Sequence, residues 1–480
     1  MQRVMLIYPP GKLYQRGEDR SQGNVDDSTS TSIRACNDLG YAAAALKRHG
    51  FAVYLRDFQT ERLTEEYLLA EFARFDPHVL LMSITNATIF HDLHLVAKLK
   101  ERKKDLVVVL KGALFFDPEP ELLAQLALDC VDYLIGGESD FVVDKLVAAH
   151  YATPAAVAQV HGILYRREGG WCKTEFSCFD SDLDSLIFPD RSLMRNDLYV
   201  RPDTGEPQAT IATSRGCSAA CIYCLTPVIS GTKIRLRSPE NIVAELRECF
   251  HTYHISNFFF KSDTFTYRKE WVQRLCEEIL RSELAGKIQW VANSRTRPLD
   301  AEVLQAMKKA GCWLVAFGFE SGSPETLLKV KKGATLEDNL AAASYAREAG
   351  LKIFGFYLVG FPWESMSHLQ ATQDMIFAIN ADFIELHLAI PYYGTPLYKM
   401  AREEGLINDS ILGRDYFNPP AVGTKFLRFD ELVEFRKKLL LRYHARPAYL
   451  AAKIRDVAMN PKVLWSYMRF GKKLIRQVLS

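Results

Sequence analysis

The chain has 480 residues, a formal net charge of +2 and a charged fraction of 25%. This near-neutral charge argues against a nucleic-acid-binding protein, and ten cysteines in so long a chain argue against a disulfide framework. No apolar run is long enough to span a bilayer, and the first apolar run is too short for the core of a signal peptide. We therefore expect a cytoplasmic protein with more than one domain.

Residues 1–150 alternate between short β-rich runs and helical patterns. The first two strands are expected at Arg3–Tyr8 and Ala52–Arg56, with a helical pattern at Leu39–Arg48 between them. Such alternation predicts an α/β domain with a doubly wound, parallel, Rossmann-like sheet. The other expected strands and helices of this domain are His78–Ile84, Leu106–Leu110, Tyr133–Ile135, Leu63–Ala73, Ile89–Lys100 and Glu121–Leu128.

The loops after these strands carry the small and polar residues of a ligand crevice. They are Pro9–Gly11, Thr85–Ala87, Lys111–Ala113 and Gly136–Glu138. In doubly wound sheets, ligands lie outside the carboxyl ends of the strands, and glycine lets the backbone approach a bulky ligand closely. Any flavodoxin-like domain has loops of this kind, so the pattern alone does not identify a ligand.

A second series of strands and helices follows a predicted connector, residues 151–204. The connector contains a strand pair at Gly162–Arg167 and Lys173–Phe179, and the second series begins at Ala209–Thr213. Six strands with crossover helices favour a partial parallel (β/α)6 barrel over residues 205–400, with an open sheet as the alternative. The other five strands are expected at Asn257–Lys261, Ile288–Ala292, Leu314–Gly318, Ile353–Val359 and Phe383–Ala389.

Residues 401–480 are expected to form a helical, basic C-terminal region. From Glu431 onward there are twelve Lys or Arg residues against Glu431, Glu434 and Asp456. This composition is typical of a helix that lies on a membrane surface or against an anionic partner, although a solvated terminal helix is the more common origin. The apolar residues interleaved with the cations are Leu464, Trp465, Tyr467, Met468, Phe470 and Leu474.

Three cysteines follow the first strand of the second series. Cys217, Cys221 and Cys224 lie within eight residues, and three thiolates can bind three corners of a [4Fe–4S] cube. Cys249 and Cys276 fall on helical patterns, and no histidine lies within twenty residues on either side of the three cysteines. One iron would therefore stay open for an exogenous ligand, as one position does in catalytic zinc sites. A three-thiolate zinc knot or buried free thiols are the alternatives.

The spacing Cys-x-x-x-Cys-x-x-Cys, with Tyr223 before the last cysteine, resembles the radical S-adenosylmethionine (SAM) superfamily. The resemblance extends over residues 205–400. After the second strand the family usually has two aspartates, and here Ser262 replaces the first, so only Asp263 corresponds. Further elements that resemble the family are Asn293–Arg295, Gly318–Gly322, Lys331–Gly333, Gly360–Pro362 and Pro391–Pro396.

This resemblance implies a [4Fe–4S] cluster on the three cysteines, SAM on the open iron, and a radical that removes hydrogen from a substrate C–H bond. It further implies that Asp263 pairs with the ammonium or ribose hydroxyls of SAM, Arg295 with its carboxylate, and Glu320 with a ribose hydroxyl or the amine. Strand-end solvation is the alternative for both carboxylates, and a surface position is the alternative for Arg295. The remaining residues expected at SAM are Tyr223, Ser321, Gly360, Phe361 and Pro391.

The first domain resembles the cobalamin-binding domain that precedes many radical SAM cores, chiefly through Asp38–Lys47, Val108–Gly112 and Gly136–Glu138. Two departures stand out. Lys111 replaces a usual glycine, and the Asp-x-His-x-x-Gly motif is absent, because His94 lies on a predicted helix. We therefore expect cobalamin without a histidine ligand on cobalt. The residues expected to contact it are Tyr8, Thr85, Asn86, Lys111, Gly112, Gly136, Gly137 and Glu138.

The two resemblances together imply methylation of an unactivated carbon in a small-molecule substrate, with two SAM molecules consumed. A lipid-like substrate is one option. A cyclase or rearrangement enzyme of the same architecture is the first alternative. A methylthiotransferase fits poorly, since only Cys36 and Cys130 precede residue 150, and the complete triad opposes a non-catalytic scaffold with a vestigial cluster. We further expect a flavodoxin- or ferredoxin-type electron donor, no nucleic-acid partner, and peripheral membrane contact through the basic C-terminal region.

Overall fold

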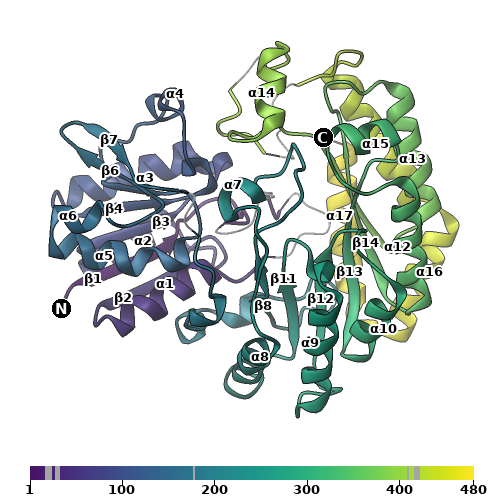
Figure 1. Ribbon diagram of the computed structural model, residues 1–480, viewed down its shortest axis with the longest axis horizontal. Coiled ribbons are helices and arrows are strands. Elements are labelled where there is room, and N and C mark those ends of the chain that lie inside the picture. Colours follow the sequence, from purple (N-terminus) through teal and green to yellow (C-terminus); the bar gives the residue numbers. More distant parts are fainter. Residues whose placement is uncertain (17–23, 27–32, 177–178, 408–409, 416–421, 480) are drawn as a thin grey trace.

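The computed structural model describes residues 1–480 except 17–23, 27–32, 177–178, 408–409, 416–421 and 480. Two sheets covered by helices lie side by side, with the amino-terminal sheet in purple and blue and the second sheet in teal and green (Figure 1). The three cysteines predicted to bind a cluster lie after the first strand of the second sheet. The α/β fold class is confirmed.

The first sheet has seven strands in the order β2-β1-β3-β4-β5-β6-β7. Strands β1 to β5 are parallel, as the alternating pattern of residues 1–150 predicts, and β6 and β7 add an antiparallel hairpin at one edge. The strands are β1 Arg3–Tyr8, β2 Ala52–Asp57, β3 Val79–Ser83, β4 Val107–Lys111, β5 Tyr133–Ile135, β6 Ile163–Arg167 and β7 Gly170–Lys173.

The β6–β7 hairpin was expected in a separate connector, whereas it continues the first sheet through pairing of β6 with β5. The prediction of its second strand at Lys173–Phe179 is wrong, since β7 ends at Lys173. Glu168 and Gly169 both have positive φ angles and form a two-residue turn, so pairing resumes at once with Arg167 opposite Gly170. Residues 177–178 of the predicted strand lie outside the described residues.

Helices cover both faces of this sheet. Alternate apolar side chains of β1 point to opposite faces, so each face needs cover from water. Met5 and Ile7 join one apolar cluster, whereas Val4 and Leu6 join another. All five residues of β3 are buried, as expected of a parallel strand covered on both faces. The helices of this domain are α1 Asn37–Arg48, α2 Glu65–Phe75, α3 Ile89–Arg102, α4 Pro120–Ala124, α5 Val143–Ala152 and α6 Pro154–Val157.

The second sheet has six parallel strands in the order β15-β14-β13-β12-β11-β8. In the described part of the chain, β8 and β15 are not hydrogen-bonded to each other, which agrees with a barrel that stays open. The strands are β8 Gln208–Ala212, β11 Asn257–Lys261, β12 Gln289–Ser294, β13 Cys312–Glu320, β14 Lys352–Val359 and β15 Phe383–Leu388.

Helices pack on one face of this second sheet, and the core between them is aromatic. Phe260 stacks on Trp290 with ring centroids 4.6 Å apart, and both side chains are fully buried. The helices between the strands are α8 Pro239–Tyr253, α9 Lys269–Arg281, α10 Ala301–Lys309, α11 Pro324–Lys329, α12 Leu336–Glu348 and α13 Met366–Ile379. The apolar core thereby leaves the carboxyl ends of the strands for polar side chains.

The C-terminal region is helical, as predicted. Its helices are α14 Pro396–Glu403, α15 Phe429–His444, α16 Pro447–Met459 and α17 Leu464–Leu479. Helix α15 packs against the edge strand β15, and the Tyr443 hydroxyl donates a hydrogen bond of 2.6 Å to the Ala381 carbonyl. Among the described residues, no helix is both long and apolar enough to cross a membrane.

Candidate functional site

The three cysteines lie on a loop that begins and ends at a short antiparallel ribbon, β9 (Ser214–Arg215) with β10 (Arg235–Leu236). Gly216 starts the loop with φ of 81°, and a Cβ on it would lie 2.3 Å from the Lys233 carbonyl oxygen. Only glycine fits this turn. Helix α7 (Thr226–Ser230) follows the last cysteine and completes what we call the cluster loop, residues 216–231.

Each cysteine sulfur faces a polar group. The Cys221 Sγ accepts a hydrogen bond from Arg295 Nη1 at 3.4 Å, and Cys224 Sγ lies 3.1 Å from the hydroxyl of Thr226. Cys217 Sγ lies 3.8 Å from the Thr264 hydroxyl. Hydrogen-bond donors and cations favour the thiolate form that binds iron.

The donor set therefore fits a [4Fe–4S] cluster by its chemistry: three thiols on one loop, beside a cation. The three sulfurs point to different neighbours, and within the described ranges no three His, Cys, Asp or Glu side chains converge on one point as a bound ion would require. Cys217 and Cys221 are buried, which would shield a bound cluster from solvent.

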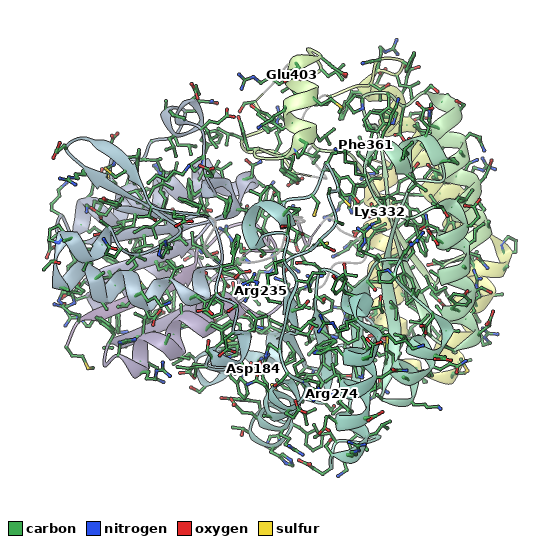
Figure 2. The ribbon with its side chains drawn as sticks, in the orientation of Figure 1. Asp184, Arg235, Arg274, Lys332, Phe361 and Glu403 are labelled. Carbon is green, nitrogen blue, oxygen red and sulfur yellow. The ribbon has the colours of Figure 1, made fainter. Side chains whose placement is uncertain are left out.

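Glu320 and Lys332 form a buried ion pair at the carboxyl end of β13, with Lys332 Nζ 2.7 Å from the carboxylate. Glu320 has φ of 63° beside a register shift in β13. A Cβ at Gly318 would lie 2.4 Å from that carboxylate and 2.8 Å from Lys332 Nζ, so a side chain there would displace the ends of both partners. Figure 2 shows Lys332 on the side of the second sheet that carries this site. Glu320 is thus held in place by its partner, not merely solvated at a strand end.

Arg295 is half-buried and is not the surface arginine of the alternative interpretation. It donates to the Lys332 carbonyl as well as to Cys221. Burial lowers its pKa, but the thiols of Cys221 and Cys217 raise it, and the net shift is upward. The guanidinium therefore stays charged beside the cluster loop, where it can pair with a carboxylate.

The turn after β14 brings together two predicted SAM residues. Phe361 stacks on Trp363 with centroids 5.5 Å apart and lies 5.9 Å from the Tyr223 ring, which makes an apolar surface suited to adenine. Burial raises the pKa of Tyr223 well above its ordinary value, and the nearby Glu320 adds to the effect. Tyr223 therefore stays neutral.

Glu364 holds this turn, and sequence reasoning missed it. Gly360 has φ of 94°, and the N–H groups of Gly360 and Phe361 donate to Glu364 Oε2 at 2.7 and 3.1 Å. Thr326 donates to the other carboxylate oxygen at 3.0 Å. Burial raises the pKa of Glu364. The sequence offered one sign of this contact, a glutamate four residues after Gly360 that could accept the N–H groups of the turn.

Two other predicted SAM residues have structural partners of their own. The Ser321 hydroxyl lies 3.0 Å from the Thr372 hydroxyl and accepts the Ser323 N–H at 3.1 Å, so it ties the loop after β13 to α13. Pro391 is buried beside Tyr392, which packs against Leu225 of the cluster loop. Their contacts to SAM stay predictions.

A pocket between the two domains brings Asp263 together with residues predicted to face cobalamin. Its first-domain lining comes from the loops after β4 and β5, and its other lining comes from β9, α7 and the end of β11. The lining residues are Lys111, Ala113, Gly136, Gly137, Glu138, Ser214, Arg215, Ile229, Ser230, Lys261, Ser262 and Asp263. Candidate residues for both cofactors thus share one space.

Lys111 is paired inside the first domain, which accounts for its departure from the family glycine. Its ammonium donates to Asp38, whose other carboxylate oxygen accepts the Tyr8 hydroxyl, and Ser83 also donates to Asp38 at 3.4 Å. All four side chains are buried. Burial raises the pKa of Tyr8, so this hydroxyl stays protonated. Sequence reasoning missed the role of Asp38 as the counter-ion.

Glu138 pairs with the second domain. Its carboxylate accepts two hydrogen bonds from Arg235, at 2.8 and 2.5 Å, and two residues later Asp140 pairs with Arg215. The four side chains are at most 5% exposed. We call these two pairs the interdomain clasp. It ties β9 and β10, the two ends of the cluster loop, to the loop after β5.

The other predicted cobalamin residues lie outside the interdomain pocket or have packing reasons of their own. Asn86 donates to the carbonyls of Ile411 and Arg414, at 2.6 and 3.0 Å, so a C-terminal segment covers it and the adjacent Thr85. A Cβ at Gly136 would lie 2.0 Å from the Phe116 nitrogen. At Gly112 it would lie 3.0 Å from the Ile84 side chain. Close packing of the loops thus requires Gly136 whether or not a ligand binds.

Comparison with known proteins agrees with this arrangement. The model of the radical SAM superfamily matches residues 211–376, and the model of the B12 binding domain matches residues 38–146. The solved cobalamin-dependent S-adenosylmethionine radical enzyme OxsB, with aqua-cobalamin and S-adenosylmethionine bound, superimposes with a TM-score of 0.72 at 15% identity, over 97% of this chain and 72% of its own.

Three relatives match most of the chain. An uncharacterized methyltransferase of Pyrococcus horikoshii is 28% identical over 87% of this chain and 89% of its own. The cytidylyl-2-hydroxyethylphosphonate methyltransferase of Streptomyces wedmorensis is 24% identical over 97% and 92%. The anaerobic magnesium-protoporphyrin IX monomethyl ester cyclase of Cereibacter sphaeroides is 23% identical over 84% and 68%.

A cobalamin-type Rossmann domain in front of an open parallel barrel with a three-cysteine loop defines a B12-dependent radical enzyme. The chain belongs to the cobalamin-dependent radical SAM enzymes, whose cofactors are a [4Fe–4S] cluster, SAM and cobalamin. The boundaries at residues 150, 204 and 400 stay predictions.

Proposed function

We propose that this enzyme methylates an unactivated carbon of a small-molecule substrate at the expense of two SAM molecules. The observation that carries the proposal is the interdomain pocket, because Asp263 from the barrel and Lys111 with Gly136–Glu138 from the first domain face the same space. A methyl carrier on one side and a substrate radical on the other could then meet without solvent between them. The methyltransferases among the relatives support this interpretation.

When bound, the cluster supplies an electron that cleaves SAM to a radical, and cobalamin supplies a methyl carrier. The protein's own residues orient SAM and enclose the reacting groups. Arg295 presents a fixed guanidinium beside Cys221 for the SAM carboxylate, and Asp263 presents a carboxylate for its ammonium or ribose. Tyr223 and Phe361 provide an apolar surface for adenine. These contacts hold the reacting atoms in place, which is where much of an enzyme's rate advantage arises.

A cyclase or rearrangement enzyme is the second candidate, because a cyclase matches 84% of the chain. The two functions differ in stoichiometry. Methylation should release S-adenosylhomocysteine and 5′-deoxyadenosine in about equal amounts when coupled, whereas a cyclase should release no S-adenosylhomocysteine tied to product.

The experiment that separates them is anaerobic incubation of the reconstituted enzyme with deuterated-methyl SAM and a fractionated small-molecule and lipid extract. We expect a product whose mass rises by one labelled methyl group. The variant with Cys217, Cys221 and Cys224 replaced by Ala is the control and should form none. A product without label would overturn methylation and leave the radical SAM assignment intact.

The proposal also covers the enzyme's compartment, its electron donor and its contact with a membrane. Nine cysteines lie among the described residues, and all nine are free thiols. Free thiols suit a reducing, cytoplasmic compartment. A flavodoxin- or ferredoxin-type protein would donate the electron to the cluster. The C-terminal region would contact a membrane surface peripherally, which would bring the enzyme close to a lipid-like substrate.

A further inference from the structure

The outer surfaces of α16 and α17 leave large apolar side chains in water. Ile454 is 71% exposed, Met459 70%, Trp465 69%, Met468 56% and Ile475 60%. We call these five residues the apolar face. Single exposed apolar residues are ordinary on a protein surface, but five large ones on two consecutive helices are more than chance exposure explains.

The spacing along α17 shows that this exposure is a second apolar side of the helix. Trp465, Met468 and Ile475 recur at intervals of three and seven residues and share one stripe. The opposite side of α17 already packs against the protein. Ser466 is buried, Leu474 packs on the main core, and the Phe470 ring lies 5.3 Å from that of His444. The protein's own core therefore does not account for the outer residues.

The apolar stripe of α17 also carries exposed cations. Arg469 and Lys472 are exposed on the same stripe of α17. Asp456 is the only acidic residue after residue 446, and it is turned inward, 2.8 Å from Lys352 Nζ and accepting the Tyr467 hydroxyl at 2.8 Å. Among the described residues of this stripe, the charged side chains are therefore cationic.

We propose that the apolar face docks on a bilayer that contains anionic lipid, with Trp465 and Ile475 in the boundary between headgroups and acyl chains and Arg469 and Lys472 at the phosphates. This inference deepens and rests on the membrane contact of the proposed function, and it is independent of the methylation chemistry. A second copy fits poorly, because two such stripes would bring Arg469 and Lys472 of one copy against the same cations of the other. A nucleic acid would leave the apolar side chains in water.

The test is co-sedimentation of the full-length reconstituted protein with vesicles of phosphatidylcholine alone or mixed with phosphatidylglycerol. We expect binding to the mixed vesicles, weakened by salt. Removing two cations in Arg469→Gln/Lys472→Gln should weaken it about thirty-fold, at roughly a factor of five per surface cation. Trp465→Ser/Ile475→Ser should weaken it by a similar or larger factor.

Matched controls remove the same chemistry elsewhere. Arg102→Gln/Lys104→Gln takes two exposed cations from the end of α3, and Leu280→Ser/Leu340→Ser takes two partly exposed leucines from α9 and α12. Both controls should bind like the unmodified protein, and all variants should keep its iron content.

Three outcomes would overturn the inference. One is equal vesicle binding by the α17 variants and the controls. Another is equal binding to neutral and anionic vesicles. The third is a dimer in vesicle-free solution that Trp465→Ser/Ile475→Ser dissociates, because a second copy would then cover the face. None of these outcomes bears on labelled product formation, so methylation and docking fail separately.

Discussion

Asp57 is a carboxyl group whose burial opposes its charge. Three hydrogen bonds favour the carboxylate, from the Thr60 N–H at 3.0 Å, the Thr60 hydroxyl at 2.6 Å and the Tyr199 hydroxyl at 3.0 Å. Desolvation outweighs them and raises the pKa from 3.8 to about 6. The folded protein therefore binds this proton more tightly than the unfolded chain does.

This shift predicts that part of the protein's stability is lost with rising pH. The contribution of Asp57 is fully present below the unfolded pKa near 3.8 and disappears as pH rises through about 6. A shift of about two pKa units corresponds to about 3 kcal/mol. Urea unfolding of the metal-free protein should therefore show a smaller loss of stability between about pH 4 and about pH 7 in Asp57→Asn than in the unmodified protein. An unchanged pH dependence in the variant would contradict the assignment.

Among single residues, spacing alone suffices to predict the cluster cysteines, because all three predicted ligands lie on one loop. Partners remote in sequence could not be found in this way. In the sequence, Lys111 only departs from the family's glycine. The fold shows its partner, Asp38, which lies 73 residues earlier. Arg295 similarly becomes interpretable only once β12 places it against Cys221.

At the scale of elements, buried strands were predictable because continuous apolar runs leave little choice. Strands β1, β5 and β11 match their expected bounds. The β6–β7 hairpin was misassigned because its strands are short and its polar residues face water, so local pattern gave no sign that it extends the first sheet. That sheet edge depends on tertiary pairing with β5.

The interdomain clasp joins the loop after β5 to the β9–β10 ribbon, and its loss should be costly. Removing one partner of a buried ion pair leaves an unpaired charge, at about 3 to 5 kcal/mol. Glu138→Gln and Arg235→Gln should each lower the free energy of unfolding by about 3 kcal/mol, and the double variant should cost less than their sum.

The pair Arg274–Glu240 is the matched control for the clasp, because its side chains are 64% and 56% exposed at 2.9 Å. Glu240→Gln should cost under about 1 kcal/mol. Urea titration of all four variants makes the comparison. Additive losses in the double variant, or a clasp cost as small as the control, would show that the pair does not hold the two elements together.

Over the whole molecule, the two domains could be predicted separately, but their contact could not. Each domain follows from its own alternating pattern, whereas Arg235 and Glu138 lie 97 residues apart and only the folded chain shows that they meet. The C-terminal chain adds a further long-range contact, because Asn86 binds the carbonyls of Ile411 and Arg414. Residues predicted to lie near one cofactor are therefore positioned by segments remote in sequence.

The predicted residues for the two metal cofactors lie in different domains, so we expect that each cofactor can be lost without the other. The three cluster thiols belong to the loop between β9 and β10, whereas Lys111 and Gly136–Glu138 follow strands of the first sheet. Replacing Cys217, Cys221 and Cys224 by Ala should therefore abolish iron content and SAM cleavage while cobalamin stays bound. The clasp does not involve the thiols and should keep the first domain in place.

The measurement is gel filtration after anaerobic reconstitution with iron, sulfide and hydroxocobalamin, followed by absorbance and iron analysis of the protein peak. We expect a cobalamin spectrum without a histidine ligand on cobalt, at equal stoichiometry in the unmodified protein and the triple variant. Full iron retention in the variant would refute the cluster assignment. Peaks without cobalamin absorbance for both proteins would instead mean that the first domain has kept the fold of a cobalamin-binding domain without its ligand, with the buried Lys111–Asp38 pair as the residue-level cause to test next.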